Sequence, residues 1–380
     1  MKNLTFQIVF LTVVSIGAVT GSALAYELDW SPPYPVSPGN SGAFSMNCSP
    51  QGAFYVIYVD EDANTLESYI NNKNMITEAF VDDLESPQYA FNAVDFGLEI
   101  PTLIFYDYFT DSIRTAFHLG DDWGSPTELG ESNGARNVKL DMRDGVFHIA
   151  FNYDEPGTDN CYLRYLSNPG GAWFMESVAR ISRSAINPRF DMKVDSTGTP
   201  HFVWWDHYSL EMIHAVRTGE NTYDTELFYP DSVSCLWIEL ELLYPDILVV
   251  GFLDSFGGTT RTIRMAYKIG SSWYDLDIYD NTSIGAIDMA IDNEDTITTS
   301  DLHFILSQSD GYFCISPVAG GWSVQEITRL STHSPATAIQ ADWDIYNDTV
   351  GISVHNSATN RIYFLRGTPI YPTPTPTPTP

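Results

Sequence analysis

Apolar and polar residues alternate in short runs along most of the chain, and these runs return with a fixed period. One aromatic position marks the repeat, with successive steps of 50, 50, 50 and 49 residues. It is occupied by Trp123, Trp173, Tyr223, Trp273 and Trp322. Each of them opens an alternating segment, which predicts a half-buried β-strand. Stepping back from Trp123 reaches Met75 and then Tyr26, so the pattern predicts seven such outer strands.

A second element of the repeat is a short apolar strand that an acidic or amide residue closes. These closing residues are Asn47, Asp95, Asp141, Asp195, Glu241, Asp292 and Asp342. A turn and a second strand follow, most clearly in FDMKVDSTGTPHFVWWD at 190–206, and a third strand comes next. Each repeat therefore predicts a four-stranded antiparallel meander. Sheets of this kind bury both faces when they stack side by side in a ring.

The two ends of the repeat array are offset. The last repeat stops after its third strand, whereas the first outer strand, 26–30, precedes the first inner strand. We therefore predict an all-β fold over residues 26–370, a seven-bladed β-propeller of four-stranded antiparallel blades closed by its N-terminal strand. That strand should lie beside 361–366 and protect an open edge. An open β-solenoid or two β-sandwiches would leave the offset unexplained.

The ends of the chain carry two further signals. Lys2, an apolar run at 6–19 and small residues before Tyr26 predict a signal peptide over residues 1–25. The run is short for a retained anchor. The tail YPTPTPTPTP at 371–380 predicts an extended Pro/Thr-rich linker or tail. Such a spacer favours a further module beyond it; a tail that is itself modified or attached to the envelope is the alternative. We expect a secreted monomer, extracellular or associated with a bacterial cell envelope, with no membrane span after cleavage.

Acidic residues outnumber basic ones strongly, with 49 Asp and Glu against 18 Lys and Arg and a net charge of −31. A field of this sign opposes binding to nucleic acid and to anionic lipid. It also disfavours polyanionic polysaccharides. We therefore expect an extracellular glycan or protein as the partner, with neutral glycans, peptides and cationic partners all open.

Cysteine and histidine give little support for a metal or cofactor. An oxidising compartment would permit disulfides, but the repeat places the four cysteines in different blades; they are Cys48, Cys161, Cys235 and Cys314. Their spacing is not that of a metal site. His148, His201 and His303 share one repeat position, which favours packing over ligation. The segment Asp60, Glu61 and Asp62 could hold Ca²⁺, although it lacks the spacing of a known calcium loop.

Acidic residues recur in the loops between the second and third strands, at Asp60, Asp107, Asp154, Asp206 and Asp254. Two carboxylates in one pocket could act as acid and base in glycoside hydrolysis, which makes Asp107, Asp154 and Asp206 the catalytic candidates. A repeated Asp that begins a turn also commonly forms an Asx turn with its own backbone. Both interpretations stay open from the sequence.

Aromatic and basic residues on the same predicted face are the ligand-binding candidates. The aromatic group could stack on pyranose rings or pack between blades; it comprises Tyr106, Tyr108, Trp205, His207 and Tyr208. The basic group could hold an anion or balance acidic charge; it comprises Arg136, Arg180, Arg183 and Arg189. Loops on one rim of a propeller would bring these groups together.

The motif V-D-x-x-G-x-P-H-F-V-x-x-D, at 194–206, resembles the secreted bacterial propeller repeats of the sialidase-like, BNR-type group. The resemblance implies the architecture over nearly the whole chain. The strict Asp-box Ser-x-Asp-x-Gly-x-Thr-Trp does not occur, and no motif matches the arginine triad or Tyr–Glu pair of sialidases. Polysaccharide lyases on propellers act on anionic substrates, which the charge disfavours.

These observations favour a secreted, non-catalytic recognition module that binds glycan or protein through the loop face of a propeller. A sialidase-like glycoside hydrolase or lyase, with acids at the channel mouth, is one alternative, and a structural envelope protein is another. An enzyme should place two carboxylates in one pocket, whereas a binding module should present exposed aromatics without such a pair.

Overall fold

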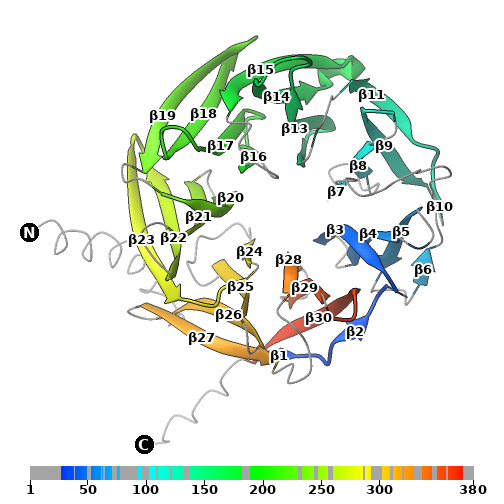
Figure 1. Ribbon diagram of the computed structural model, residues 1–380, viewed down its shortest axis with the longest axis vertical. Helices are drawn as coiled ribbons and strands as arrows, with labels where there is room; N and C mark the ends of the chain where they lie inside the picture. Colours follow the sequence, from blue (N-terminus) through cyan, green and yellow to red (C-terminus); the bar gives the residue numbers. More distant parts are fainter. Residues whose placement is uncertain are drawn as a thin grey trace, which may run out of the picture.

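The computed structural model is a ring of seven β-sheets that radiate from a common centre like the blades of a propeller (Figure 1). It describes residues 27–37, 39–48, 53–60, 62, 65–70, 75–77, 92–95, 102–107, 110–119, 122–131, 135, 137–181, 189–229, 233–243, 247–255, 260–285, 287–291, 302–308, 311–318, 321–328, 336–344, 349–356 and 358–370. The predicted signal peptide and Pro/Thr tail lie outside these residues. The prediction of a seven-bladed all-β propeller is confirmed.

The first three blades follow the chain in order. Blade 1 contains β3 (Ser41–Cys48), β4 (Phe54–Asp60), β5 (Thr65–Ile70) and β6 (Met75–Thr77). Blade 2 contains β7 (Asn92–Asp95), β8 (Thr102–Asp107), β9 (Ser112–Leu119), β10 (Asp122–Trp123) and β11 (Thr127–Glu131). Blade 3 contains β12 (Val138–Arg143), β13 (Val146–Asp154), β14 (Cys161–Ser167) and β15 (Phe174–Ile181), with the 3₁₀ turn η3 (Pro169–Gly171) between the last two. In blade 2 the outer strand is split, because β10 and β11 both pair with β9.

The remaining blades repeat the same meander. Blade 4 contains β16 (Phe190–Val194), β17 (Pro200–Asp206), β18 (Glu211–Gly219) and β19 (Thr222–Tyr229). Blade 5 contains β20 (Cys235–Leu243), β21 (Ile247–Asp254), β22 (Arg261–Ile269) and β23 (Ser272–Asn281). Blade 6 contains β24 (Ile287–Ile291), β25 (Leu302–Gln308), β26 (Gly311–Val318) and β27 (Gly321–Thr328). Blade 7 joins β28 (Ala336–Asp344), β29 (Thr349–Asn356) and β30 (Arg361–Ile370) to β1 (Glu27–Trp30) and β2 (Tyr34–Pro35).

The N-terminal strand closes the ring as predicted. β1 pairs antiparallel with β30, from Glu27 opposite Ile370 to Trp30 opposite Gly367. The prediction placed β1 beside 361–366, whereas β1 pairs with the next residues along β30. β2 occupies part of the expected segment, because it pairs with Tyr363 and Phe364. The buried Leu28 anchors β1, and the Gln325 side chain of blade 6 bonds both backbone groups of Leu28, at 3.1 and 2.7 Å.

Neighbouring blades are joined by apolar clusters, and the aromatic markers of the repeat belong to them. Trp173 packs against a cluster shared by blades 2 and 3, and Tyr223 against one shared by blades 3 and 4. At the seam between blades 7 and 1, a Cβ atom on Gly351 would clash with the ring of Phe54. That close approach requires glycine. The 50-residue period therefore reflects stacking of one blade on the previous one.

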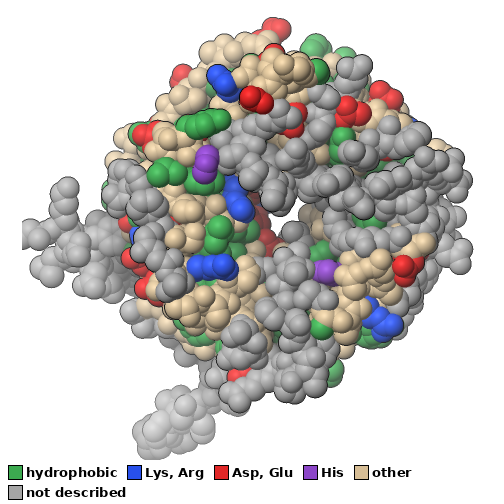
Figure 2. Space-filling view, viewed as in Figure 1, with side chains coloured by type: hydrophobic (Ala, Val, Ile, Leu, Met, Phe, Trp, Pro, Cys, Tyr) green, Lys and Arg blue, Asp and Glu red, His purple; other side chains and the backbone are tan. Residues whose placement is uncertain are grey.

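The innermost strands carry charged side chains that connect adjacent blades. The ring is hollowed at its centre, with basic and acidic side chains beside the opening (Figure 2). Lys139 of blade 3 pairs with Asp191 of blade 4 at 3.1 Å, and Lys193 of blade 4 pairs with Glu241 of blade 5 at 2.7 Å. Asp191 also accepts the Leu240 N–H of the next blade at 2.8 Å. These polar contacts link consecutive inner strands and hold the blades in register.

The repeated histidines bond within their own blades. Their ring nitrogens contact the third strand: Tyr165 for His148 at 2.5 Å, His214 for His201 at 3.0 Å, and Ser316 for His303 at 2.7 Å. Each ring thus has a hydrogen-bond partner inside its own sheet. Within the described part of the chain, no group of His, Cys, Asp and Glu is arranged to hold a metal ion.

None of the four cysteines forms a disulfide, and three of them are buried. The four belong to four different blades. The described residues contain no helix that is both long and apolar enough to cross a membrane.

Candidate functional site

The meander divides the turns between two faces of the ring. Turns between second and third strands open on one face, which we call the acidic face because it carries Asp60, Asp107, Asp154, Asp206 and Asp254. Turns between first and second strands, and between third and fourth strands, open on the opposite face. We call this the pocket face, because it contains the cavity described below.

The three catalytic candidates lie at equivalent strand ends in blades 2, 3 and 4. Asp107 contacts Arg114 at 3.1 Å and accepts the Thr110 N–H at 3.3 Å. Asp206 accepts the Tyr208 N–H and the Ser209 hydroxyl, both at 3.0 Å. These bonds are those of turn-forming carboxylates, and Asp60 accepts the Asp62 N–H in the same way at 2.9 Å. The buried Asp154 ends β13 opposite Cys161.

Four of the ligand-binding candidates come together on the acidic face of blade 4. Arg189 accepts the Trp205 N–H through its carbonyl oxygen at 3.1 Å. The centres of the Trp205 and His207 rings lie 5.1 Å apart, and those of the His207 and Tyr208 rings lie 6.2 Å apart. We call Trp205, His207 and Tyr208 the aromatic ledge. Tyr208 is 76% exposed, whereas Trp205 is half-buried and donates from its indole to the Val233 carbonyl of the blade 5 side.

The other candidates are not part of this group. Tyr106 is buried, and its hydroxyl donates to Asp111 at 2.7 Å, so packing accounts for it. Tyr108, Arg136 and Arg183 lie outside the described residues, as does Glu61 of the calcium candidate.

The sequence did not predict a cavity of 510 Å³ on the pocket face, between blades 3 and 4. Three tight turns surround it, at Asp144–Gly145, Thr197–Gly198 and Glu220–Asn221. Asp144 and Asn221 have φ values of 50° and 49°, in the left-handed region that Asp and Asn tolerate best among residues with a Cβ. The local sequence therefore fixes the turns that make the walls.

Part of the polar lining of the cavity is an ion pair that crosses from blade 3 to blade 4. Arg217 donates from Nε and Nη2 to the two oxygens of Glu176, at 2.9 and 2.5 Å, and Tyr223 donates its hydroxyl to the same carboxylate at 2.6 Å. Burial raises the pKa of Glu176, but the bonds from Arg217 and Tyr223 outweigh it and hold the pKa below its usual value. The same contact raises the pKa of Arg217. Glu176 is therefore an ionised hydrogen-bond acceptor.

A second buried pair lies beside the first. His148 and Tyr165 share a hydrogen bond, and the Arg217 guanidinium lies 6.0 Å from the centre of the Tyr165 ring. Burial, helped by the nearby Arg217, lowers the pKa of His148 to about 4. His148 is thus neutral at pH 7 and adds no positive charge to that of Arg217.

An apolar lip borders this polar lining. Phe174 and Met175, at the start of β15, are 51% and 37% exposed and line the cavity. A sequence signal for them did exist. After the marker aromatic, the outer strands continue Trp123-Gly-Ser, Tyr223-Asp-Thr, Trp273-Tyr-Asp and Trp322-Ser-Val, whereas blade 3 alone among these continues Trp173-Phe-Met. Two large apolar residues at a solvent-facing position break the repeat, and this departure marks the site.

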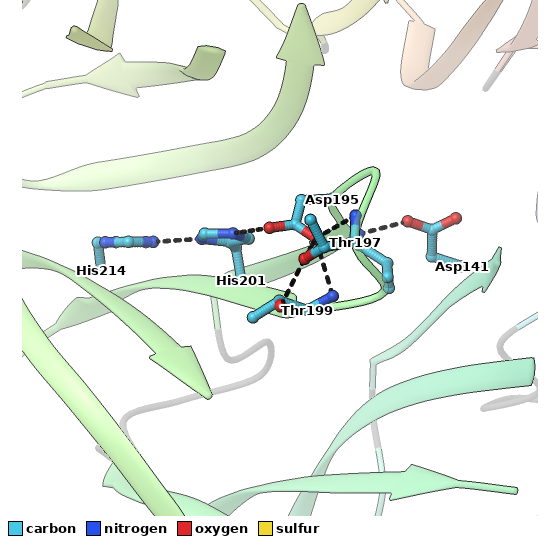
Figure 3. A network of polar contacts seen from close by, with 7 residues as sticks. Asp141, Asp195, Thr197, Thr199, His201 and His214 are labelled. Carbon is cyan, nitrogen blue, oxygen red and sulfur yellow. Dashed lines mark hydrogen bonds and ion pairs between the residues drawn. The ribbon is translucent and has the colours of Figure 1, made fainter. Parts of the chain in front are cut away.

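A polar network holds one wall of the cavity in place (Figure 3). Asp195 accepts the N–H groups of Thr197 and Thr199, at 2.9 and 2.8 Å, and contacts His201 at 3.3 Å. The network continues from His201 to His214 (Figure 3). The Thr197–Gly198 turn is therefore positioned before any ligand arrives.

Comparison with known proteins supports the fold and no particular activity. No protein family matches the chain, and no curated protein matches it. Among solved structures, polysaccharide lyase Uly1 has 9% identity over 94% of this chain and 95% of its own, with a TM-score of 0.55. BBS1N in complex with ARL6DN has 10% identity over 91% and 97%, with a TM-score of 0.55. A neuraminidase-like protein of A/little yellow-shouldered bat has 7% identity over 92% and 100%, with a TM-score of 0.49.

At such identities the likeness extends to the propeller architecture alone. The neighbours include an enzyme and a protein solved in a complex with another protein, so the fold serves both catalysis and binding. Function has to be argued from the residues of the cavity. Their arrangement, an apolar lip beside fixed donors and acceptors, can hold a small ligand that has one apolar face and several polar groups.

Proposed function

We propose that this protein is a secreted, non-catalytic recognition module of the sialidase-like propeller group that binds an extracellular glycan in the cavity between blades 3 and 4. The observation that carries the proposal is the pairing of the exposed apolar lip, Phe174 and Met175, with the hydrogen-bonded pair Arg217 and Glu176. A pyranose presents a face of C–H groups and an edge of hydroxyls. The apolar face suits an aromatic ring, and the hydroxyls suit paired donors and acceptors.

The size of the cavity favours a small ligand unit over a protein surface. Its volume of 510 Å³ lies within the range of about 300–1,000 Å³ that small-molecule sites occupy. The lining combines apolar and polar side chains, as such sites do. A single sugar residue of a longer glycan could enter while the rest of the chain remains in solvent.

The state of Glu176 favours binding over catalysis. Glycoside hydrolysis needs one carboxyl that stays protonated to act as the acid and a second carboxylate opposite it. Glu176 is held ionised by Arg217 and Tyr223, so it cannot act as that acid. The cavity does hold two more carboxylates, Asp144 and Glu220, as the hydrolase alternative requires, but both are exposed turn residues and lack the burial typical of a glycosidase acid. The candidates Asp107, Asp154 and Asp206 stand on the acidic face, away from this cavity.

The test is a glycan array probed with the purified protein, followed by calorimetry and a hydrolysis assay on each glycan that binds. We expect binding without turnover, and loss of binding in the Phe174→Ala variant. Leu227→Ala is the matched control, because Leu227 is 53% exposed on β19 and does not line the cavity. Turnover of a bound glycan would support the hydrolase alternative. Binding that Phe174→Ala leaves intact would remove the cavity as the site.

A further inference from the structure

We infer that the cavity selects uncharged sugars over acidic ones, and that Glu176 is the residue that sets this selectivity. The inference rests on the proposed function, since it assumes that a glycan enters this cavity. It assigns the chemical class of the ligand and a specificity role to one side chain.

The charges around the cavity are the first argument. Two arginines, Arg143 and Arg217, face three carboxylates, Asp144, Glu176 and Glu220. The lining histidine, His148, is neutral at pH 7 because its pKa lies at about 4. A ligand carboxylate would therefore enter a site with excess negative charge, on a protein whose net charge is −31. Like charges brought together in a partly desolvated site cost affinity.

The engagement of Arg217 is the second argument. A free guanidinium can hold a ligand carboxylate with two parallel bonds. In Arg217 that edge is already occupied, because Nε and Nη2 both donate to Glu176. Glu176 is buried and Arg217 is about one-third exposed, with side-chain exposures of 5% and 31%. A carboxylated sugar would therefore have to share Arg217 with an internal carboxylate that already neutralises its charge.

An uncharged sugar does not meet this competition. Arg217 has five N–H groups and uses two of them on Glu176, so donors remain for hydroxyl oxygens. The exposed Asn221 amide on the cavity wall adds a donor and an acceptor. Phe174 offers the stacking surface. Such a site departs from the acidic substrates that the resemblance to sialidases and propeller lyases implies.

The decisive variant is Glu176→Gln, which keeps the shape of the side chain, removes one negative charge and weakens the hold on Arg217. We expect the ratio of the affinity for a uronic-acid oligosaccharide to the affinity for a neutral one to rise by at least about tenfold, the change that 1.4 kcal/mol gives. Glu226→Gln is the control. It also removes one negative charge, but from a blade 4 residue that bonds His214 and Lys268 and does not line the cavity.

The experiment is calorimetric titration of the whole protein at pH 7 with neutral and uronic-acid oligosaccharides of equal length. We expect the unmodified protein to prefer the neutral set, and only Glu176→Gln to gain affinity for the acidic set. Stronger binding of the acidic set by the unmodified protein would overturn the inference and leave the proposed function standing. Binding of neither set, nor of any other glycan, would overturn the proposed function itself.

A second measurement does not depend on the variant folding. Binding of an uncharged ligand should change little between low and physiological salt, whereas binding of a charged one weakens as salt screens the attraction. The measurement uses the glycan that the unmodified protein binds most tightly. If its affinity falls steeply as salt increases, charge attracts that glycan, and the inference that the cavity selects uncharged sugars is overturned.

Discussion

The aromatic ledge lies on blade 4 and the cavity lies between blades 3 and 4, but they are on opposite faces of the ring and have different origins. The ledge follows the repeat, because Asp206 occupies a turn position at which blades 1, 2, 3 and 5 also carry Asp, and it holds Tyr208 through a backbone N–H. The cavity departs from the repeat, because Phe174 and Met175 of blade 3 stand where the other outer strands are more polar.

The comparison teaches how to read a repeat protein. A residue that recurs in every blade is explained by the requirement of every blade for a turn, a core contact or a packing partner. A residue that breaks the pattern without harming the fold is the better indicator of a site. The ledge presents exposed rings that rest on backbone bonds, whereas the cavity has an exposed ring beside a buried ion pair. Four changes should sharpen or break this distinction.

The largest expected effect is that of Arg217→Ala. It would leave the buried Glu176 with only Tyr223 as a side-chain partner, and an uncompensated buried charge destabilises by about 3–5 kcal/mol. We expect a value near the lower end of that range, because Tyr223 remains. Urea unfolding followed by fluorescence measures it, with the exposed Arg143→Ala as the control. If Arg217→Ala lowers the free energy of unfolding by less than Arg143→Ala does, the ion pair does not stabilise the contact between blades 3 and 4.

Acid should lower the free energy of unfolding through His148, which lines the cavity. Its pKa falls from 6.5 in the unfolded chain to about 4 in the fold, so between these values the unfolded state binds the extra proton. Stability should therefore decrease as pH falls from about 6.5 to about 4, by up to about 3 kcal/mol for this group at 1.36 kcal/mol per unit. Unfolding curves across this range, for the natural protein and for His148→Gln, measure the slope.

The variant should flatten that slope without abolishing it, because burial also lowers the pKa of His214 to about 4 and of His303 to about 3. Identical slopes in the two proteins would contradict the assignment to His148.

A smaller effect is expected from Asp206→Ala on the ledge. The substitution removes a half-buried turn carboxylate and with it two hydrogen bonds of 3.0 Å. We expect the free energy of unfolding to fall by about 1 kcal/mol, the usual net contribution of a hydrogen bond. Thermal unfolding measures the change. Glycan affinity should stay unchanged, because the turn lies on the face opposite the cavity. A loss of glycan affinity equal to that of Phe174→Ala would place the ligand on the acidic face instead.

The smallest effect is expected from Tyr208→Ala. The ring is 76% exposed, and surface substitutions of this kind usually alter stability by less than about 0.5 kcal/mol. Stability and glycan affinity should both match the natural protein. A large drop in glycan affinity, measured by the same calorimetric titration, would mean that the ledge is the binding surface.

The sequence predicted the fold well because the fold is a repeated solution to one packing requirement. Trp173 and Tyr223 recur at 50 residues because each packs against the cluster that its blade shares with the previous one. The offset between the first outer strand and the last three strands predicted closure by β1, and only the register against β30 was wrong. That register depends on where β2 turns back, which no local pattern specifies.

The site was much less predictable. Glu176 and Arg217 are 41 residues apart and meet only because two blades stack, so no motif connects them. The repeated acids are the most conspicuous chemical groups of the sequence, but the fold uses them largely for its turns and for an ion pair with Arg114. The Phe174–Met175 pair was visible in the sequence as a break in the repeat. Its meaning depended on knowing which side of the strand faces solvent.

The way β1 lies against β30 has a mechanical consequence. Glu27 stands directly opposite Ile370, so tension applied at these two residues in opposite directions loads the hydrogen bonds of the pair one after another. A pair loaded in this geometry peels open at lower force than one loaded in shear, where all the bonds resist together. In a single-molecule pulling experiment gripping Glu27 and Ile370, this seam should give way first, before the sheets of the other blades unravel.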